Sequence, residues 1–190
     1  MIETATITEA LYYLLDKIKK ADKIKLVKLM YLADKYHLIR YGRTITNDDY
    51  YAMEHGPVGT TVKDVLSLDS FNISSEGVKY ASRLIEKLDE NTFCARANAR
   101  ITLDMLSESD REALDYVIEH FGKMSSWKLR DYTHKFPEWY RYEDMFKNKL
   151  TKRERISTKE LLSTLKDDPY FRASRKHIKE TEKILVGDFA

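Results

Sequence analysis

Apolar residues recur at three- and four-residue spacing in several stretches of the chain, and this spacing marks one face of an α-helix. The first such stretch contains Ala10, Leu11, Leu14, Leu15 and Ile18. Thr6 and Glu9 stand just before it in the Thr-x-x-Glu pattern of a capping box, in which side chains satisfy the free amides of a helix start. The pattern predicts a first helix that begins near Thr6.

The second stretch follows Asp22, a residue that can cap a helix, and stops before Gly42. Glycine readily adopts the left-handed conformation that ends many helices. Between these two residues the spacing selects Ile24, Val27, Met30, Tyr31, Asp34 and Leu38. We therefore expect a long second helix with a single buried stripe.

The next segment is short, aromatic and ambiguous. Residues 50–54 fit a strand and a helical turn equally well. Gly56 and Pro57 interrupt whatever precedes them, and proline is well suited to the first position of a helix. We expect a new helix from about Val58 to Leu66.

Capping patterns recur in the rest of the chain and predict further helices. Residues 73–88 contain the turn-like Ser-Ser-Glu-Gly and then a helical pattern, whereas residues 95–103 favour a strand. The remaining start signals are Ser107-x-x-Asp110, Ser125 or Ser126, Ser157-x-x-Glu160 and Pro169, and the stop signals are Gly122 and Gly187. The count is seven or eight helices. We predict a mainly α fold, a single compact helical domain with at most a small antiparallel β element near residues 50–55 and 73–103.

Size and composition agree with one folded intracellular domain. The chain has 190 residues, of which 43% are hydrophobic and 34% charged. The single cysteine, Cys94, cannot form an internal disulfide, so we expect a reducing cytoplasm. The N-terminus lacks the pattern of a signal peptide, and the longest apolar run, residues 10–15, is far too short to span a membrane.

Charge divides the chain unevenly. Residues 147–183 contain twelve Lys and Arg but six Asp and Glu, whereas the remainder is mildly acidic. We therefore divide the chain into a helical body, residues 1–146, and a basic helical extension, residues 147–190, packed on or attached to the same domain. A solvated helix face explains this excess most simply. The alternative is a regulator that binds nucleic acid, or a host-interaction protein of a phage or mobile element, that uses the basic arm.

No catalytic or cofactor pattern is present. The chain lacks GxGxxG, GxxxxGK[ST], HExxH and GxSxG. Asp34 and His37 are three residues apart on a predicted helix and could share a face, but nothing supplies further metal ligands. We expect no enzymatic activity, no cofactor and no metal.

Tyrosine is concentrated in one part of the chain. Of thirteen tyrosines, five lie between residues 31 and 51: Tyr31, Tyr36, Tyr41, Tyr50 and Tyr51. Tyrosine suits protein interfaces because its large apolar ring carries a hydrogen-bonding hydroxyl at low entropic cost. These residues can equally belong to the core, and both interpretations stay open at this point.

Three segments in order resemble one family. The first is Lys28-Leu29-Met30-Tyr31-Leu32-Ala33-Asp34 followed by Gly42, and the second is Tyr51-Ala52-Met53-Glu54-His55-Gly56-Pro57-Val58. The third is Leu129-Arg130-Asp131-Tyr132-Thr133-His134 with Trp139. Together, from roughly Asp22 to Tyr142, they are similar to the SocA-like antitoxin family, also called the Panacea domain. Met53 departs from the tryptophan that this family commonly carries there.

The resemblance implies a mainly helical domain that neutralises a cognate toxin by direct protein–protein binding. Some members resemble adaptors that deliver the toxin to a cellular protease, and others occur in phages and mobile elements. Combined with the tyrosine cluster, it predicts that the partner contacts Tyr36, Tyr41, Tyr50, His55, Gly56 and Pro57. The motif residues expected to act as scaffold are Tyr31, Asp34, Val58, His134 and Trp139. We expect the ring nitrogens of His134 and Trp139 to bond to backbone carbonyls. Neither a membrane nor a nucleic acid is an expected partner.

Overall fold

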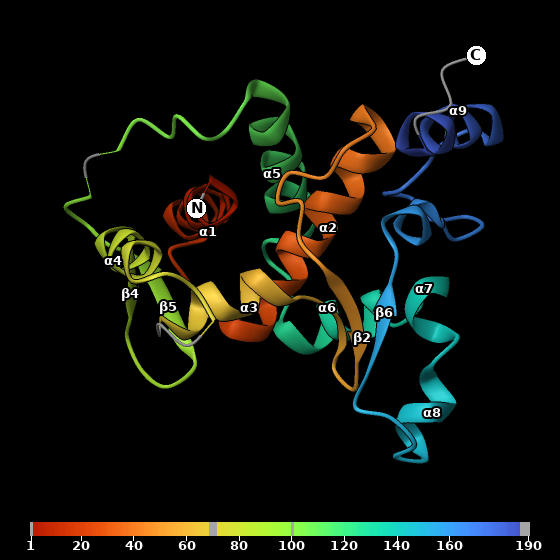
Figure 1. Ribbon diagram of the computed structural model, residues 1–190, viewed down its shortest axis with the longest axis horizontal. Helices are drawn as coiled ribbons and strands as arrows, with labels where there is room; N and C mark the ends of the chain where they lie inside the picture. Colours follow the sequence, from red (N-terminus) through yellow and green to blue (C-terminus); the bar gives the residue numbers. More distant parts are fainter. Residues whose placement is uncertain (1, 69–71, 100, 187–190) are drawn as a thin grey trace.

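The structure, a computed structural model, describes residues 2–68, 72–99 and 101–186. Its helices are α1 (Ile2–Ile18), α2 (Lys23–Tyr41), α3 (Thr60–Ser67), α4 (Ser75–Leu84), α5 (Glu108–Phe121), α6 (Ser126–Thr133), α7 (Pro137–Tyr140), α8 (Glu143–Lys147), the 3-10 helix η1 (Thr158–Leu162) and α9 (Arg175–Val186). The strands are β1 (Lys20–Asp22), β2 (Tyr50–Met53), β3 (Gly56–Gly59), β4 (Ile85–Lys87), β5 (Thr92–Ala95) and β6 (Arg153–Ile156). The expected mainly α fold with a minor antiparallel component is confirmed (Figure 1).

Helix α2 runs through the middle of the molecule (Figure 1). In the view of the figure, α1, α3 and α5 lie on one side of it, and β6, α7 and α9 lie on the other. Every residue from Leu26 to Ile39 is buried except Tyr36, which is half-buried. The predicted single stripe is therefore too narrow, because α2 is covered on all sides. Neither α2 nor any other helix of the described residues is long and apolar enough to cross a membrane.

Both ends of α2 form as the sequence predicts. The Asp22 side chain accepts a hydrogen bond from the Lys25 amide at 2.9 Å. Gly42 ends the helix with φ +78°, and its amide donates to the Leu38 carbonyl at 3.0 Å. A residue with a Cβ would be strained in this conformation.

Two small sheets flank the helices, both antiparallel and three-stranded. The first has the order β1-β5-β4, with Ala21 opposite Phe93 in its register. The second has the order β3-β2-β6. A two-residue turn, Glu54–His55, joins β2 to β3, and Tyr50 lies opposite Ile156 of β6. The segment after residue 147 thus contributes a strand to the body, which its charge pattern does not indicate.

The predicted start of α1 is wrong. The helix begins at Ile2, so Thr6 lies inside it. The Glu9 carboxylate instead accepts hydrogen bonds from the Tyr80 hydroxyl at 2.7 Å and the Met105 amide at 2.9 Å. A tertiary contact has taken the side chain that the capping pattern would use.

The predicted helix from Val58 also begins elsewhere. Gly56, Pro57 and Val58 belong to β3, and α3 starts at Thr60. The α3 amides of Thr61 and Val62 donate to Asp48, each at 2.9 Å. Because this cap lies more than ten residues earlier in the chain, local sequence around Pro57 does not reveal it.

Later capping signals are largely correct. Ser107 and Asp110 form a capping box on α5, Ser125 caps α6, and Ser157 with Glu160 caps the short η1. The strand expected over residues 95–103 lies earlier, at β5.

Pro169 does not start the last helix. Instead the Asp168 carboxylate accepts from the amides of Tyr170 and Phe171, which makes a turn, and α9 begins at Arg175. Gly187, the predicted stop, lies outside the described residues.

Gly42→Ala should destabilise the protein by about 1–2 kcal/mol, because alanine is strained at this positive φ. A new Cβ would meet only Ile184, at 3.7 Å, so conformation rather than collision sets the cost. Urea denaturation measures the change. Lys19→Gly is the matched control, since Lys19 has φ +72° after α1, and this variant should keep or gain stability. Equal losses in both variants would contradict the argument.

Candidate functional site

Asp34 is the buried hub that holds the loop after α2. Its carboxylate accepts from the amides of Ile45 at 2.7 Å and Thr46 at 3.1 Å, and also from the Thr46 hydroxyl. The Tyr50 hydroxyl donates to it at 2.6 Å. Burial raises the pKa of Asp34 to about 6, while these hydrogen bonds act in the opposite direction.

The structure corrects the prediction for Tyr50. Its side chain is only 3% exposed and its ring packs edge-on against Tyr31, with centroids 5.8 Å apart. Tyr50 is therefore a core residue of β2, and a partner cannot touch it in this conformation.

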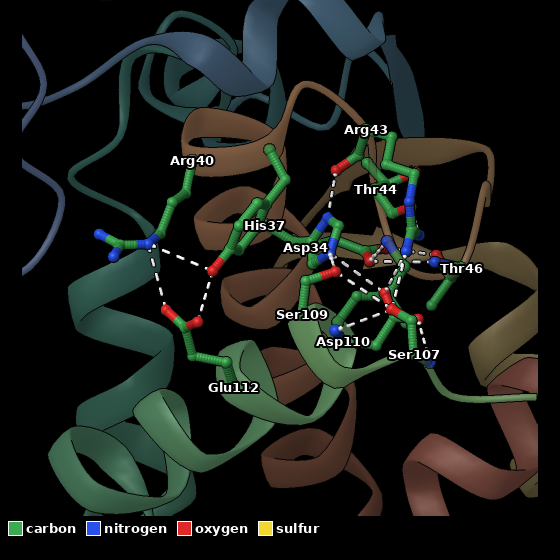
Figure 2. Close-up of polar contacts among 12 residues, drawn as sticks. Asp34, His37, Arg40, Arg43, Thr44, Thr46, Ser107, Ser109, Asp110 and Glu112 are labelled. Carbon is green, nitrogen blue, oxygen red and sulfur yellow. Dashed lines mark hydrogen bonds and ion pairs between the residues drawn. The ribbon is translucent and has the colours of Figure 1, made fainter.

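His37 and Asp110 continue the polar contacts from α2 to α5 (Figure 2). One ring nitrogen of His37 lies 2.8 Å from the Arg43 carbonyl, and the other lies 3.1 Å from Asp110 Oδ1. Arg43 donates to the same Asp110 oxygen at 2.8 Å. Burial lowers the pKa of His37. In the part of the chain that the structure describes, no group of three or more His, Cys, Asp or Glu is placed to hold a metal ion.

Beyond this network, α2 and α5 share an exposed face, which we call the Tyr36 face: Tyr36, Arg40, Tyr41, Glu112 and Tyr116. The rings of Tyr36 and Tyr116 stack with centroids 4.1 Å apart. Arg40 Nε lies 3.1 Å from Glu112 Oε1, and the Tyr41 hydroxyl donates to the other oxygen (Figure 2). Tyr41 is 40% exposed. The face presents three tyrosines and an arginine whose positions neighbouring side chains hold.

A cavity of about 310 Å³ adjoins the Tyr36 face. Its lining consists of Tyr36, Ile39, Arg40, Tyr170, Phe171, Arg172, Ala173, Ser174 and His177. Two arginines line it and no carboxylate does, among the residues described. The cavity is therefore suited to a negatively charged group.

The predicted turn contacts lie elsewhere. His55 is exposed at the tip of the β2–β3 hairpin, whereas Gly56 and Pro57 are buried beneath it, so only His55 presents its side chain to a partner. The hairpin tip points away from the C-terminal end of α2 (Figure 1). Lys28, which contacts the hairpin, and Tyr41 are separated by about 20 Å along α2, from its 1.5 Å rise per residue. The sequence suggests one contact region, and the structure has two.

The remaining motif residues lie inside the molecule. Tyr31 is fully buried and donates to Glu138 Oε1 at 2.6 Å, and Val58 is buried opposite Tyr51. The Trp139 indole donates to the Met53 carbonyl at 2.7 Å, as expected. The His134 ring stacks on Trp139 with centroids 3.5 Å apart.

Sequence reasoning missed the buried charges beneath these surfaces. Lys28 donates to the Pro57 carbonyl at 2.7 Å, and Lys35 pairs with Glu138 at 2.6 Å. Lysine is rarely buried, so its place in a helical pattern normally indicates solvent. Arg40 could have been predicted from the sequence, since it follows Tyr36 by one helical turn and so lies on the same helix face.

The basic C-terminal segment is partly neutralised. Lys147 pairs with Glu143, Arg155 with Asp49, Lys159 with Glu182 and Lys176 with Glu180. These pairs are largely exposed, so each contributes little to stability. They dilute the positive charge that a nucleic acid would meet.

Most of the chain, including most of α2 and the β2–β3 hairpin, matches a known protein family. Residues 26–140 match the model of a family described as antitoxin SocA-like, Panacea domain. The chain belongs to this family. No curated protein and no solved structure matches it. The resemblance drawn from the three motifs is thus confirmed.

Within this SocA-like chain, the matched segment runs from α2 to α7 and contains the hairpin and the α2 and α5 parts of the Tyr36 face. Membership in an antitoxin family suggests a regulatory role without catalysis, and in general implies a cognate toxin as partner.

Gly56→Val should lower the free energy of unfolding by about 3 kcal/mol or more, since a branched residue is strained at φ +102°. A Cβ there would also lie 2.8 Å from Lys28 Nζ and 3.1 Å from His134 Cδ2. The measurement is chemical denaturation. His55→Ala, at the exposed neighbouring position, should change stability by less than about 0.5 kcal/mol. A tolerated valine would show that the turn adjusts freely.

Asp34→Asn should reveal the titration of Asp34. Its pKa is raised in the folded state, so the folded protein binds the extra proton between about pH 4 and pH 6. Stability from this group is therefore complete below about pH 4 and is lost as pH rises through 6. The wild-type free energy of unfolding minus that of the variant should fall by about 3 kcal/mol across this window. A flat difference would mean that the hydrogen bonds keep Asp34 ionised throughout.

Proposed function

We propose that this protein is an antitoxin that neutralises its cognate toxin by binding it directly through the Tyr36 face, without catalysing a reaction. The observation that carries the proposal is the preorganised group of tyrosines and arginine on this face, in a chain of the SocA-like antitoxin family. Tyrosine and arginine are the residue types that most often dominate binding energy at protein interfaces.

Preorganisation supports this choice of surface. The Tyr36–Tyr116 stack and the contacts of Glu112 with Arg40 and Tyr41 restrict the side chains before any partner arrives. Binding then costs less conformational entropy, because fewer rotamers remain to be ordered.

The neighbouring cavity indicates the chemistry of the partner. Arg40 and Arg172 line it, and Arg40 is exposed. We propose that an acidic side chain of the toxin enters here, since arginine can donate two parallel hydrogen bonds to a carboxylate.

The hairpin tip is a secondary contact in this proposal. His55 is available to a partner, and Gly56 and Pro57 act only by setting the shape of the turn beneath it. A toxin that reached both regions would have to span roughly the 20 Å that separates them along α2.

Tyr41→Ala should weaken toxin binding by about 2 kcal/mol, roughly 30-fold, because it removes an exposed anchor of the face. Its melting temperature should stay close to that of the wild type. Binding is measured by calorimetry with the product of the adjacent gene, and function by rescue of growth on co-expression. Tyr140→Ala is the matched control, since Tyr140 is a 60% exposed tyrosine on α7, and it should bind normally.

A second control separates binding from folding. Tyr50→Phe removes the hydroxyl that donates to Asp34, so it should lower stability without changing affinity. If Tyr41→Ala binds and rescues like wild type, the Tyr36 face is not the site. A partner that is harmless alone would contradict the antitoxin role itself. Rescue that requires an active cellular protease would assign delivery for degradation rather than masking.

A further inference from the structure

Three basic side chains meet beneath the β2–β3 hairpin: Lys28 of α2, Arg130 of α6 and His134 at the end of α6. The backbone at Gly56 locates two of them, because a Cβ there would lie 2.8 Å from Lys28 Nζ and 3.1 Å from His134 Cδ2. Arg130 lies one turn before His134 on α6 with its Nε buried, and its charge lowers the pKa of both neighbours. We call this group the Lys28 cluster.

The Lys28 cluster holds more hydrogen-bonding capacity than the protein satisfies. Lys28 is fully buried, and its ammonium, with three N–H groups, donates to the Pro57 carbonyl. Arg130 Nε and His134 Nε2 are also buried, and neither has a hydrogen-bond partner among the described residues. Each such atom costs about 1–3 kcal/mol, so native proteins seldom leave two together.

The charges near the Lys28 cluster do not stabilise it, because the neighbours that act most strongly are themselves positive. Burial, and then the charge of Arg130, lowers the pKa of Lys28 to about 7. Burial, and then Arg130 and Lys28, lowers the pKa of His134 to about 4, while the His55 carbonyl and Asp131 act in the opposite direction.

Asp131 does not lie within the cluster. Its side chain is largely exposed, and it pairs with Nη1 of Arg130 at 3.1 Å rather than with the buried Nε. A carboxylate close to the three nitrogens is what the arrangement lacks, as far as the described residues show.

Lys35 provides an internal comparison. It is as buried as Lys28 and lies two turns later on the same helix. Its ammonium meets Glu138 at 2.6 Å and two backbone carbonyls. The fold thus supplies a counter-charge to one buried lysine and withholds it from the other.

The Arg130 side chain extends from the cluster to the surface. Arg130 is partly exposed, and its Cζ lies 5.6 Å from the centroid of the Trp127 ring. Trp127 is 58% exposed, and the exposed His55 stands perpendicular to it with centroids 6.3 Å apart. Two surface side chains, Trp127 and His55, therefore lie beside the exposed part of Arg130.

We propose that Lys28, Arg130 and His134 form a binding site for an oxyanion, a phosphate or carboxylate group, that enters between His55 and Trp127. Lys28 Nζ and Arg130 Nε donate to its oxygens, and His134 Nε2 does so once it is protonated. Such charge-assisted hydrogen bonds are stronger than neutral ones. The anion supplies the missing counter-charge, and the site does not depend on the antitoxin role or on the Tyr36 face.

Anion binding at this site must be linked to proton uptake. A negative charge beside Lys28 and His134 favours their charged forms and raises both pKa values. Affinity therefore increases as pH falls. The charged and titratable groups that face the site are Arg130, Asp131, the exposed His55 and the two groups themselves, and the linkage is carried by Lys28 and His134.

Trp139 provides the readout, because its ring stacks on His134 and a protonated imidazole quenches tryptophan fluorescence. In Trp127→Phe, Trp139 is the one remaining tryptophan of the two in the chain. Sulfate and trifluoroacetate are the probes, since both stay ionised across the quenching midpoint, which lies near the His134 pKa of about 4. We expect sulfate or trifluoroacetate, at ionic strength matched with chloride, to shift this midpoint upward by about one pH unit, a roughly tenfold effect. Thermal denaturation of the wild type should show the same preference for low pH.

Arg130→Gln should remove this shift, whereas Arg141→Gln, which alters an exposed arginine paired with Glu160, should keep it. Circular dichroism checks that both variants fold. A stronger effect of sulfate assigns a phosphate-type ligand, and a stronger effect of trifluoroacetate assigns a carboxylate. No shift with either probe, or an equal shift in Arg130→Gln, would overturn the proposal.

Discussion

Between Leu26 and Ile39, helix α2 is buried at every residue except the half-buried Tyr36, and yet it carries charged side chains. A charge removed from water needs a partner inside the protein. Lys35 shows how strictly this need organises the fold. Its three N–H groups are used by Glu138 at 2.6 Å, the Leu161 carbonyl at 2.8 Å and the Ser163 carbonyl at 2.5 Å. One ammonium therefore ties α2 to α7 and η1, segments that follow it by more than a hundred residues. Removing one partner of such a pair typically costs about 3–5 kcal/mol.

The same requirement places the surfaces that a partner would meet. Asp34 draws in the loop of residues 43–50, and His37 joins α2 to α5 through Asp110. Tyr36 lies between these two buried residues on α2, and Arg40 follows one turn after Tyr36. The backbone that carries Tyr36 and Arg40 is held in place by the buried side chains of Asp34 and His37. Buried contacts thus preorganise the surface side chains.

Structural features that depend on neighbouring residues in the sequence could be predicted, and those that depend on residues far away in the sequence could not. The ends of α2 at Asp22 and Gly42 and the capping box of α5 use neighbours in sequence, so the pattern was enough. The start of α3 depends on Asp48, and β6 reaches β2 from a hundred residues away, so neither has a local pattern.

The candidate site divides in the same way. Tyr41 is exposed and Tyr36 is half-buried, whereas the Tyr50 side chain is buried and donates to Asp34. Arg172 joins the cavity lining through a distant loop. Only the folded chain shows which tyrosines of one aromatic window reach solvent.

The hydrogen bonds from Lys35 to the carbonyls of Leu161 and Ser163 limit which part of the gene could encode a stable domain by itself. The matched family segment ends at Tyr140, but the two carbonyl acceptors of Lys35 and the strand β6 lie after it. A recombination event that copied only the recognisable segment would leave a buried ammonium short of acceptors and β2 as an open sheet edge, which is prone to aggregation. The unit that can fold is therefore longer than the segment that the family model matches. Phe171 belongs to it, because this buried residue contacts the rings of Phe121 and Phe136.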